Sequence, residues 1–165
     1  WLSYCPNLTH LSLKNNKLTS LEGISFCKNL ERLDLDNNQI SDITDLKDAT
    51  ELSYLSLENN RIQSIQPLSS CTKLQILNLN QNRLQDIKAI KELKTLVSLL
   101  MKNNNLFSIE GLEKHPSLEQ LDIRENPIKE IGTTLDKCHR LKFLGIAHPW
   151  MLSFKRQKQL VSCYT

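Results

Sequence analysis

Two carboxylates and an amide alternate in the segment ERLDLDNNQI, where Asp34, Asp36 and Asn38 lie two residues apart. Oxygen ligands at this spacing begin a calcium-binding loop, and a pair of carboxylates can also serve as general acid and base. A calcium loop that starts at Asp34 needs a glycine at its sixth position and a glutamate at its twelfth, where the chain has Gln39 and Asp45. The segment therefore does not predict a metal site.

The other reactive residues form no catalytic pattern either. His10 has no Cys, Ser or carboxylate arrangement in its own segment that would make a triad. The chain lacks a glycine-rich phosphate loop, an H-E-x-x-H motif and a C-x-x-C pair. We therefore predict that the protein is not an enzyme and uses no cofactor, metal or small-molecule substrate.

Length and composition predict one folded domain over residues 1–165. Hydrophobic residues make up 39% of the chain and charged residues 24%, which is enough apolar material for a packed core. No apolar run approaches the ~18 residues of a membrane span, and the net charge of +3 is too small to indicate nucleic-acid binding. We predict neither a membrane nor a nucleic acid as partner.

The spacing of the Asp and Asn residues belongs to an internal repeat. Six segments follow the pattern L-x-x-L-x-L-x-x-N-x-[LI]-x-x-[LI] at a period of 22 residues, with Met101 and Ile123 replacing the third leucine in two of them. A degraded seventh copy follows after 23 residues. The copies begin at Leu8, Leu30, Leu52, Leu74, Leu96, Leu118 and Leu141.

Each copy predicts a short strand, a turn and a compact return. Leu33 and Leu35 alternate with polar residues, which is the period of a strand with one buried face. The apolar residues then change to a spacing of three, as in Ile43, Leu46 and Ala49, which suits a 3₁₀ turn better than an α-helix. A buried amide at the turn can bond backbone groups of its own copy and of the neighbouring copy. That column consists of Asn16, Asn38, Asn60, Asn82, Asn104 and Asn126.

These copies resemble leucine-rich repeats of the 22-residue subclass, and the resemblance covers residues 2 to about 154. It implies an α/β solenoid with a curved parallel sheet on the concave side and a 3₁₀-rich, irregular convex side. Similar repeats occur in regulatory subunits of protein phosphatase 1, axonemal dynein light chains, ciliary and centrosomal proteins, a spliceosomal adaptor and bacterial internalins. The resemblance implies a binding role and no enzymatic one.

One column of the repeat holds most of the cysteines, three residues before the first leucine of a copy. Buried free cysteine packs as a small hydrophobe, and the same column accepts alanine, leucine and histidine elsewhere. We therefore expect free, buried thiols rather than disulfides, which favours a reducing, cytoplasmic location. The resemblance adds the cilium or centrosome as a location. The column consists of Cys5, Cys27, Ala49, Cys71, Leu93, His115 and Cys138.

The second, third, fifth, seventh and eighth positions of each copy are expected on or near the concave face. They hold an acidic group in copies two and three, with Asp36 flanked by Lys14 and Glu58, and an apolar strip beside it. The alternative is that this surface has no partner, because scattered exposed apolar residues need no explanation. The predicted partner-binding residues are Arg32, Asp34, Asp36, Tyr54, Glu58, Ile76, Leu100, Lys102 and Arg124.

The charge of this face indicates the kind of partner. The second, third, fifth and seventh positions together with Glu125 carry five bases and seven acids, so the face is about −2 while the chain is +3. Nucleic-acid affinity comes largely from bases that neutralise phosphates, so an acidic face suits a protein with basic and apolar side chains. The preferred function is an intracellular protein-interaction scaffold or regulatory module, with a ciliary, centrosomal or phosphatase-regulatory role implied by the resemblance. A nucleic-acid-associated adaptor and an internalin-like adhesin are the alternatives.

The two ends depart from the repeat. Residues 150–165 predict a short amphipathic helix that caps the last copy, and a basic calmodulin- or membrane-binding helix is the alternative. Trp1, Leu2 and Tyr4 resemble the tail of an earlier copy, so we expect the chain to be a fragment of a longer protein. The cap has basic and apolar sides formed by Phe154, Lys155, Arg156, Lys158, Leu160 and Val161.

Overall fold

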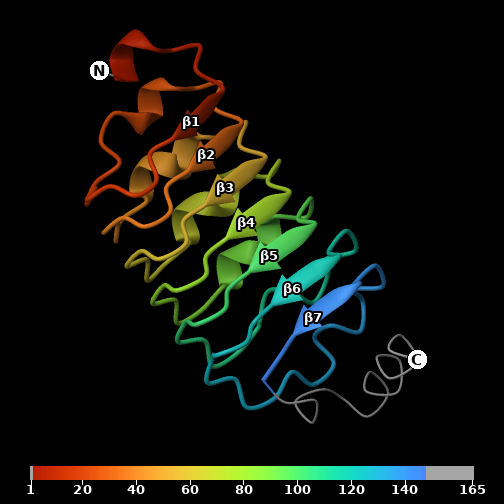
Figure 1. The fold of residues 1–165 in the computed structure, drawn as a ribbon. Coiled ribbons are helices and arrows are strands. Elements are labelled where there is room, and N and C mark those ends of the chain that lie inside the picture. Colours follow the sequence, from red (N-terminus) through yellow and green to blue (C-terminus); the bar gives the residue numbers. More distant parts are fainter. Residues whose placement is uncertain (1, 148–165) are drawn as a thin grey trace.

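The computed structural model describes residues 2–147 as a stack of seven short parallel strands in one curved sheet. The strands follow one another in chain order, and the return segments cover the opposite side of the stack (Figure 1). The predicted cap at 150–165 lies outside the described residues. The strands are β1 (His10–Ser12), β2 (Arg32–Asp34), β3 (Tyr54–Ser56), β4 (Ile76–Asn78), β5 (Ser98–Leu100), β6 (Gln120–Asp122) and β7 (Phe143–Gly145).

Every strand occupies the third to fifth positions of its repeat, and neighbouring strands pair without an offset. Leu33 faces Leu55 across β2 and β3, for example. The 23-residue step keeps the same register, because Leu121 pairs with Leu144. The additional residue therefore lies in the return, where Ile131 and Cys138 are one residue further apart than Ile109 and His115.

The core is a continuous stack of leucine and isoleucine side chains between the sheet and the returns. Leu33, Leu55, Leu77 and Leu99 are fully buried, and burying a leucine contributes about 1.5–3 kcal/mol relative to leaving it exposed. The leucines of the first repeat, such as Leu11, are only partly buried. Burial is complete where a repeat has neighbours on both sides, as expected of a solenoid.

The asparagine column confirms the role predicted for it. Asn38 donates from Nδ2 to the carbonyl oxygens of Leu35 and Asp36 in its own turn, and to Leu13 of the preceding repeat at 3.0 Å. Its Oδ1 accepts the backbone N–H of Leu18 at 3.0 Å. The amide thus joins two repeats at each turn and satisfies backbone groups that the turn leaves without partners.

The residue before each column asparagine has left-handed backbone geometry, which the sequence analysis did not identify. Its φ lies between 53° and 58° in all six repeats. Asparagine tolerates this region better than most residues, and it fills four of the six positions. The sequence feature that could have indicated this geometry is the Asn-Asn pair, whose first residue has the positive φ. The residues are Asn15, Asn37, Asn59, Gln81, Asn103 and Glu125.

The convex side consists of 3₁₀ helices and turns, and residues 2–147 contain no α-helix. The three-residue apolar spacing correctly predicted 3₁₀ geometry in the second to fourth repeats. The fifth and sixth repeats return through turns alone. No helix within the described range is long and apolar enough to cross a membrane. The 3₁₀ helices are η1 (Leu2–Tyr4), η2 (Ile24–Phe26), η3 (Thr44–Asp48), η4 (Gln66–Ser70) and η5 (Lys88–Glu92).

Most of the cysteine column is buried against the preceding return, as predicted, but Cys5 in the first return is only partly buried, as is Ala49. Cys71 directs its Sγ to the carbonyl oxygen of Leu46 at 3.5 Å, and Cys27 makes the corresponding contact with Cys5. His115 is fully buried in the same column, and its Nε2 lies 2.9 Å from the carbonyl oxygen of Ile90. The column is a packing feature in which a thiol or a ring nitrogen reaches a neighbouring carbonyl.

Candidate docking surface on the concave sheet face

An apolar strip crosses the middle of the concave face. Tyr54 on β3 and Ile76 on β4 are direct cross-strand partners. Leu100 lies diagonally from Ile76, one strand further and two residues along, because Ile76 pairs with Ser98. The side chain of Ile76 is 39% exposed, although its strand neighbour Leu77 is fully buried. We refer to Tyr54, Ile76 and Leu100 as the apolar strip.

Arg32 lies over the aromatic end of this strip. Its guanidinium carbon is 3.5 Å from the centroid of the Tyr54 ring, a cation–π contact between adjacent strands β2 and β3. Such a contact contributes about 0.5–1 kcal/mol at an exposed site. It restricts the rotation of both side chains, so the aromatic surface is presented in one orientation before any partner arrives.

An acidic cluster, defined as Asp34, Asp36 and Glu58, lies next to the strip at the carboxyl ends of β2 and β3. Lys14 pairs with Asp34 at 3.7 Å. This corrects the expectation that Lys14 would offset Asp36. The reason is the strand register, which places Asp34 beside Ser12, within reach of the long Lys14 side chain two residues further on.

Asp36 obtains its hydrogen bonds from neutral groups instead. Its Oδ1 accepts the Ser56 hydroxyl at 2.5 Å and the backbone N–H of Glu58 at 2.8 Å. Burial raises the pKa of Asp36, these two hydrogen bonds lower it, and the nearby carboxylates of Asp34 and Glu58 raise it again, so that the net shift is upward. A cation from a partner would relieve this repulsion.

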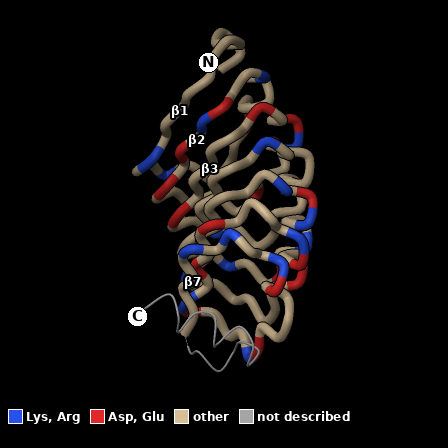
Figure 2. Tube along the Cα trace, turned by 90° about the vertical axis from the view of Figure 1, so that its right-hand side faces the viewer, with Lys and Arg blue, Asp and Glu red and all other residues tan. Residues whose placement is uncertain are grey.

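Glu58 is likewise held by amides. Its Oε2 accepts Nδ2 of Asn78 at 2.9 Å and its Oε1 accepts Nε2 of Gln81 at 3.1 Å. Within the described residues, neither Asp36 nor Glu58 has a cation within ion-pair distance. Asp36 and Glu58 are therefore held by hydrogen bonds but not neutralised, whereas Asp34 is paired with Lys14. Acidic segments follow β2 and β3 in Figure 2.

The opposite end of the face contains bases that are each paired with an acid. Lys102 lies 3.0 Å from Oε1 of Glu125. Arg124 forms a two-pronged pair with Asp122, in which Nε and Nη2 are 2.9 and 2.6 Å from the two carboxylate oxygens. Burial alone would raise the pKa of Asp122, but the hydrogen bonds and charge of Arg124 outweigh it and lower the pKa.

Gly145 makes room for this pair. A Cβ atom at this position would lie 2.5 Å from Oδ1 of Asp122 and 3.1 Å from Nε of Arg124. The residue pairs directly with Asp122 across β6 and β7. The absence of a side chain therefore lets Asp122, which is 6% exposed, lie over the last strand and hold Arg124 there.

The sequence itself agrees with a known repeat family over most of the described part. The family described as "Leucine Rich repeats (2 copies)" matches residues 6–48 and 50–94. The chain belongs to the leucine-rich-repeat family. A comparison with curated proteins finds no significant match.

Solved structures with the same fold include other leucine-rich-repeat proteins. An internalin, inlF, from Listeria monocytogenes is 24% identical over 92% of this chain and 50% of its own, with a TM-score of 0.77. Internalin C2 from the same organism is 23% identical over 88% and 84%, with a TM-score of 0.65. A Leptospira interrogans leucine-rich-repeat protein is 24% identical over 98% and 42%, with a TM-score of 0.84. This chain spans about half the length of the first of these proteins. At these identities the similarity shows the fold alone.

The leucine-rich-repeat scaffold places all nine predicted partner-binding residues on or beside one face of the sheet. It brings Arg32, Tyr54 and Ile76 together, and it separates the acidic cluster from Lys102 and Arg124 by the uncharged strand β4. Two residues that shape this surface were not predicted: Ser56, which bonds Asp36, and Gly145, which makes room for Asp122. Both occupy the fifth position, where small residues among polar ones were the available signal.

Residues 2–147 contain no group of three or more His, Cys, Asp or Glu side chains that could hold a metal ion. The three polar residues of the segment ERLDLDNNQI have two different roles. Asn38 points into the turn, where its amide joins two repeats, while Asp34 and Asp36 lie on the sheet face.

Proposed function

We propose that this leucine-rich-repeat chain binds another protein on its concave face, and that the partner presents basic and apolar side chains there. Leucine-rich repeats generally mediate protein–protein interaction. The observation that carries the proposal for this chain is the position of the apolar strip beside Asp36 and Glu58, two carboxylates that have no cationic partner among residues 2–147. Exposed apolar side chains next to unneutralised charge are groups that a complementary partner would stabilise.

Substitution of the strip tests this surface. Tyr54→Ala with Ile76→Ala is expected to abolish capture of proteins retained by the wild type, as measured by quantitative mass spectrometry of affinity eluates. A matched control is Phe107→Ala, because Phe107 is 66% exposed but lies on the turn side, away from the sheet. Retention of the same proteins by the double variant, or equal loss with Phe107→Ala, would exclude the concave face.

The remaining functional expectations are part of the same proposal. We infer a cytoplasmic location from the buried cysteines Cys27 and Cys71 of the column, whose thiols form no disulfide, which suits a reducing compartment. The ciliary, centrosomal or phosphatase-regulatory role is a hypothesis supported by the 22-residue period alone. Leucine-rich-repeat proteins are generally non-enzymatic scaffolds, and we propose the same for this chain.

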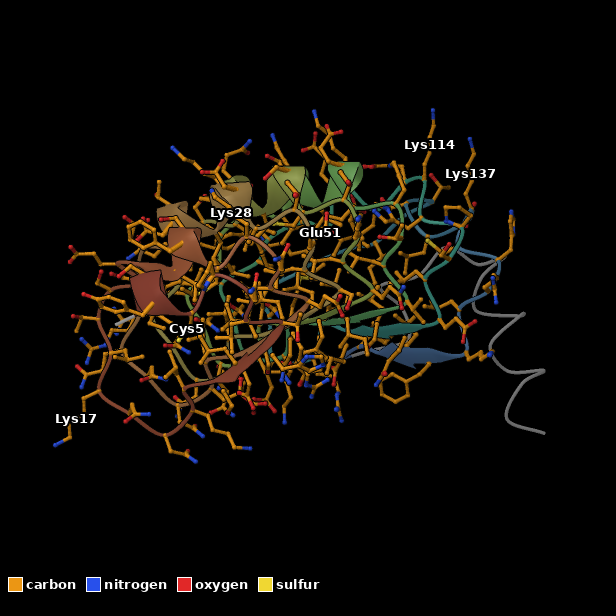
Figure 3. All side chains as sticks on the ribbon, turned by 90° about the horizontal axis from the view of Figure 1, so that it is seen from above. Cys5, Lys17, Lys28, Glu51, Lys114 and Lys137 are labelled. Carbon is orange, nitrogen blue, oxygen red and sulfur yellow. The ribbon has the colours of Figure 1, made fainter. Side chains whose placement is uncertain are left out.

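The nucleic-acid alternative would use bases away from the sheet. Lys28, Lys114 and Lys137 project from the convex side (Figure 3), but Lys28 already lies 3.9 Å from Asp48. Several other convex lysines pair with acids, including Lys88 with Glu110. A steep fall of affinity for single-stranded RNA or DNA with added salt would support this alternative, and salt-insensitive or absent binding would exclude it.

A further inference from the structure

The concave face is charged differently at its two ends. Its amino-terminal half, β1–β3, carries two bases and four acids. Strand β4 presents no charged residue, and Ile76, Asn78 and Asn80 occupy its third, fifth and seventh positions. In the half formed by β5–β7, Lys102 and Arg124 are balanced one to one, and Glu119 is shared between Arg140 at 2.9 Å and Lys142 at 2.8 Å. At the same face positions the carboxyl-terminal half therefore carries three bases and three acids and has no net charge, whereas the amino-terminal half is acidic.

The arginine at that end retains binding capacity. Asp122 engages Nε and one hydrogen of Nη2, so three of the five guanidinium N–H groups remain for another acceptor. The Arg124 side chain is 47% exposed, whereas Asp122 is 8% exposed. Because Asp122 and the space over Gly145 fix the guanidinium in advance, a carboxylate that binds it loses less entropy than with a free arginine.

We propose that the concave face binds a peptide segment in one orientation, with a basic side chain over Asp36 and Glu58, apolar side chains over the strip, and a carboxylate at Arg124. This inference rests on the proposed function and adds the order of charges in the partner. The segment lies across the strands, because each strand has only three residues while the features extend from β2 to β6.

The strand spacing sets the length of this segment. Four steps of about 4.8 Å separate β2 from β6, or roughly 19 Å. An extended peptide spans that distance with about six residues and an α-helix with about thirteen. The occupant is thus a short linear segment with a base at one end, apolar residues in the middle and an acid at the other end.

Selection from a displayed library of random 16-residue peptides tests the charge order. Peptides are selected on residues 1–165, and those that still bind the Tyr54→Ala, Ile76→Ala variant are removed. The expected result is enrichment of Lys or Arg at one end and Asp or Glu at the other, always in the same order. Two substitutions then locate the ends on a purified selected peptide, Glu58→Gln for its base and Arg124→Gln for its acid.

Each pairing is measured as a double-mutant cycle by fluorescence anisotropy. Neutralising the peptide acid should weaken binding to the wild type by about two- to fivefold, as for exposed ion pairs, and should have no effect on Arg124→Gln. Neutralising the peptide base should weaken binding less for Glu58→Gln than for the wild type, and some effect should remain because Asp36 keeps its charge. Arg61→Gln, an exposed arginine on the turn side, is the control and should leave binding unchanged.

The outcomes separate the two proposals. If no enriched peptide depends on Tyr54 and Ile76, the concave face is not a docking surface and both proposals fail. If peptides depend on the strip but show no charge order, or if neither cycle shows coupling, the orientation is overturned while the docking surface stands. Coupling of the acid to Arg124 and of the base to Glu58 establishes the orientation.

Discussion

Asn60 accepts the backbone N–H of Ile40 through its Oδ1 at 3.0 Å and so connects the third repeat to the second. Its Nδ2 also donates to the carbonyl of Leu35 in that repeat, and to Leu57 and Glu58 in its own turn. The side chain is 7% exposed, so water cannot replace these bonds. One amide therefore satisfies four backbone groups of two repeats.

Replacement of this residue should uncouple the two repeats. Asn60→Ala is expected to lower the free energy of unfolding by about 1–3 kcal/mol, because the buried N–H of Ile40 loses its acceptor, while the three carbonyls keep donors from Asn37, Asn38 and Asn82. Urea unfolding followed by circular dichroism measures the change. Asn16→Ala is the matched control, since Asn16 is exposed and bonds only Leu13 and Lys14 in its own turn. Equal losses would show that the inter-repeat bonds add nothing.

Asp36→Asn is expected to stabilise the protein at pH 7 and to have no effect near pH 3.5. Burial and the neighbouring carboxylates raise the pKa of folded Asp36 above its unfolded value of about 3.9, so the folded state holds the proton more tightly. The resulting loss in the free energy of unfolding is absent below the unfolded pKa of Asp36 and complete above its folded pKa. Asparagine can still accept the bonds from Ser56 and Glu58 through its oxygen.

The gain should be below about 1 kcal/mol, because the carboxylate is partly exposed to solvent. Urea unfolding at both pH values measures it, with Glu130→Gln, an exposed carboxylate on the turn side, as the control. A loss of stability at pH 7 would mean that the carboxylate is favourable where it lies.

His115 should make the protein sensitive to mild acid. Burial lowers the pKa of its imidazole below 6.5 and the positive charge of Lys94 acts in the same direction, and together they outweigh the carbonyls of Ile90 and Leu112 and the charge of Glu113, which raise it. The folded state therefore disfavours the proton, and stability that is complete above the unfolded pKa of about 6.5 is lost as the pH falls below it.

His115→Leu is expected to remove this part of the pH dependence. Leu93 fills the same column one repeat earlier and is fully buried, so leucine fits the site in shape. Between pH 7.5 and 5 the wild type should lose about 1 kcal/mol more than the variant, measured as the shift of the urea midpoint at each pH. The exposed His139 provides the comparison, because His139→Gln should retain the wild-type slope. Parallel curves for wild type and His115→Leu would contradict the assignment.

Gly145→Ala should destabilise the carboxyl-terminal end of the sheet by about 1–3 kcal/mol, the usual range for overpacking. The added methyl group would lie 2.5 Å from Asp122 Oδ1 and would force the Asp122–Arg124 pair off the last strand. Differential scanning calorimetry of Gly145→Ala, Asp122→Ser and the double variant measures the coupling. The glycine substitution should have little effect once Asp122 is removed. Additive losses would show that the strain lies elsewhere.

Much of the fold could be predicted because the same pattern of buried leucines recurs in seven copies, the last of them degraded. The alternation at Leu33 and Leu35 predicts a strand, and the asparagine column predicts the turn, whichever residues surround them. The return was less predictable. Its three-residue spacing correctly indicated 3₁₀ geometry around Leu46 and Leu68, but the same spacing around Leu112 gives only turns.

The electrostatics of the candidate site could not be predicted from columns alone. The column order suggested that Lys14 offsets Asp36, whereas the side chains pair diagonally and Lys14 reaches Asp34. The rotamer of each side chain decides whether it pairs with its direct or its diagonal neighbour, and the sequence does not specify the rotamer. The role of Gly145 could not be predicted either. In the sequence it is only a departure of the seventh copy from the repeat, whereas in the structure Asp122 lies over it.

The additional residue of the last repeat is absorbed entirely between Ile131 and Cys138, while β6 and β7 keep the register of every other pair. The two sides of the solenoid thus differ in how they respond to insertions. The convex returns can lengthen without moving a single residue of the sheet, whereas one added residue in a strand would turn its leucines outward. Loops or tags introduced by protein engineering belong in the returns, where the spacing of the groups offered to a partner is preserved.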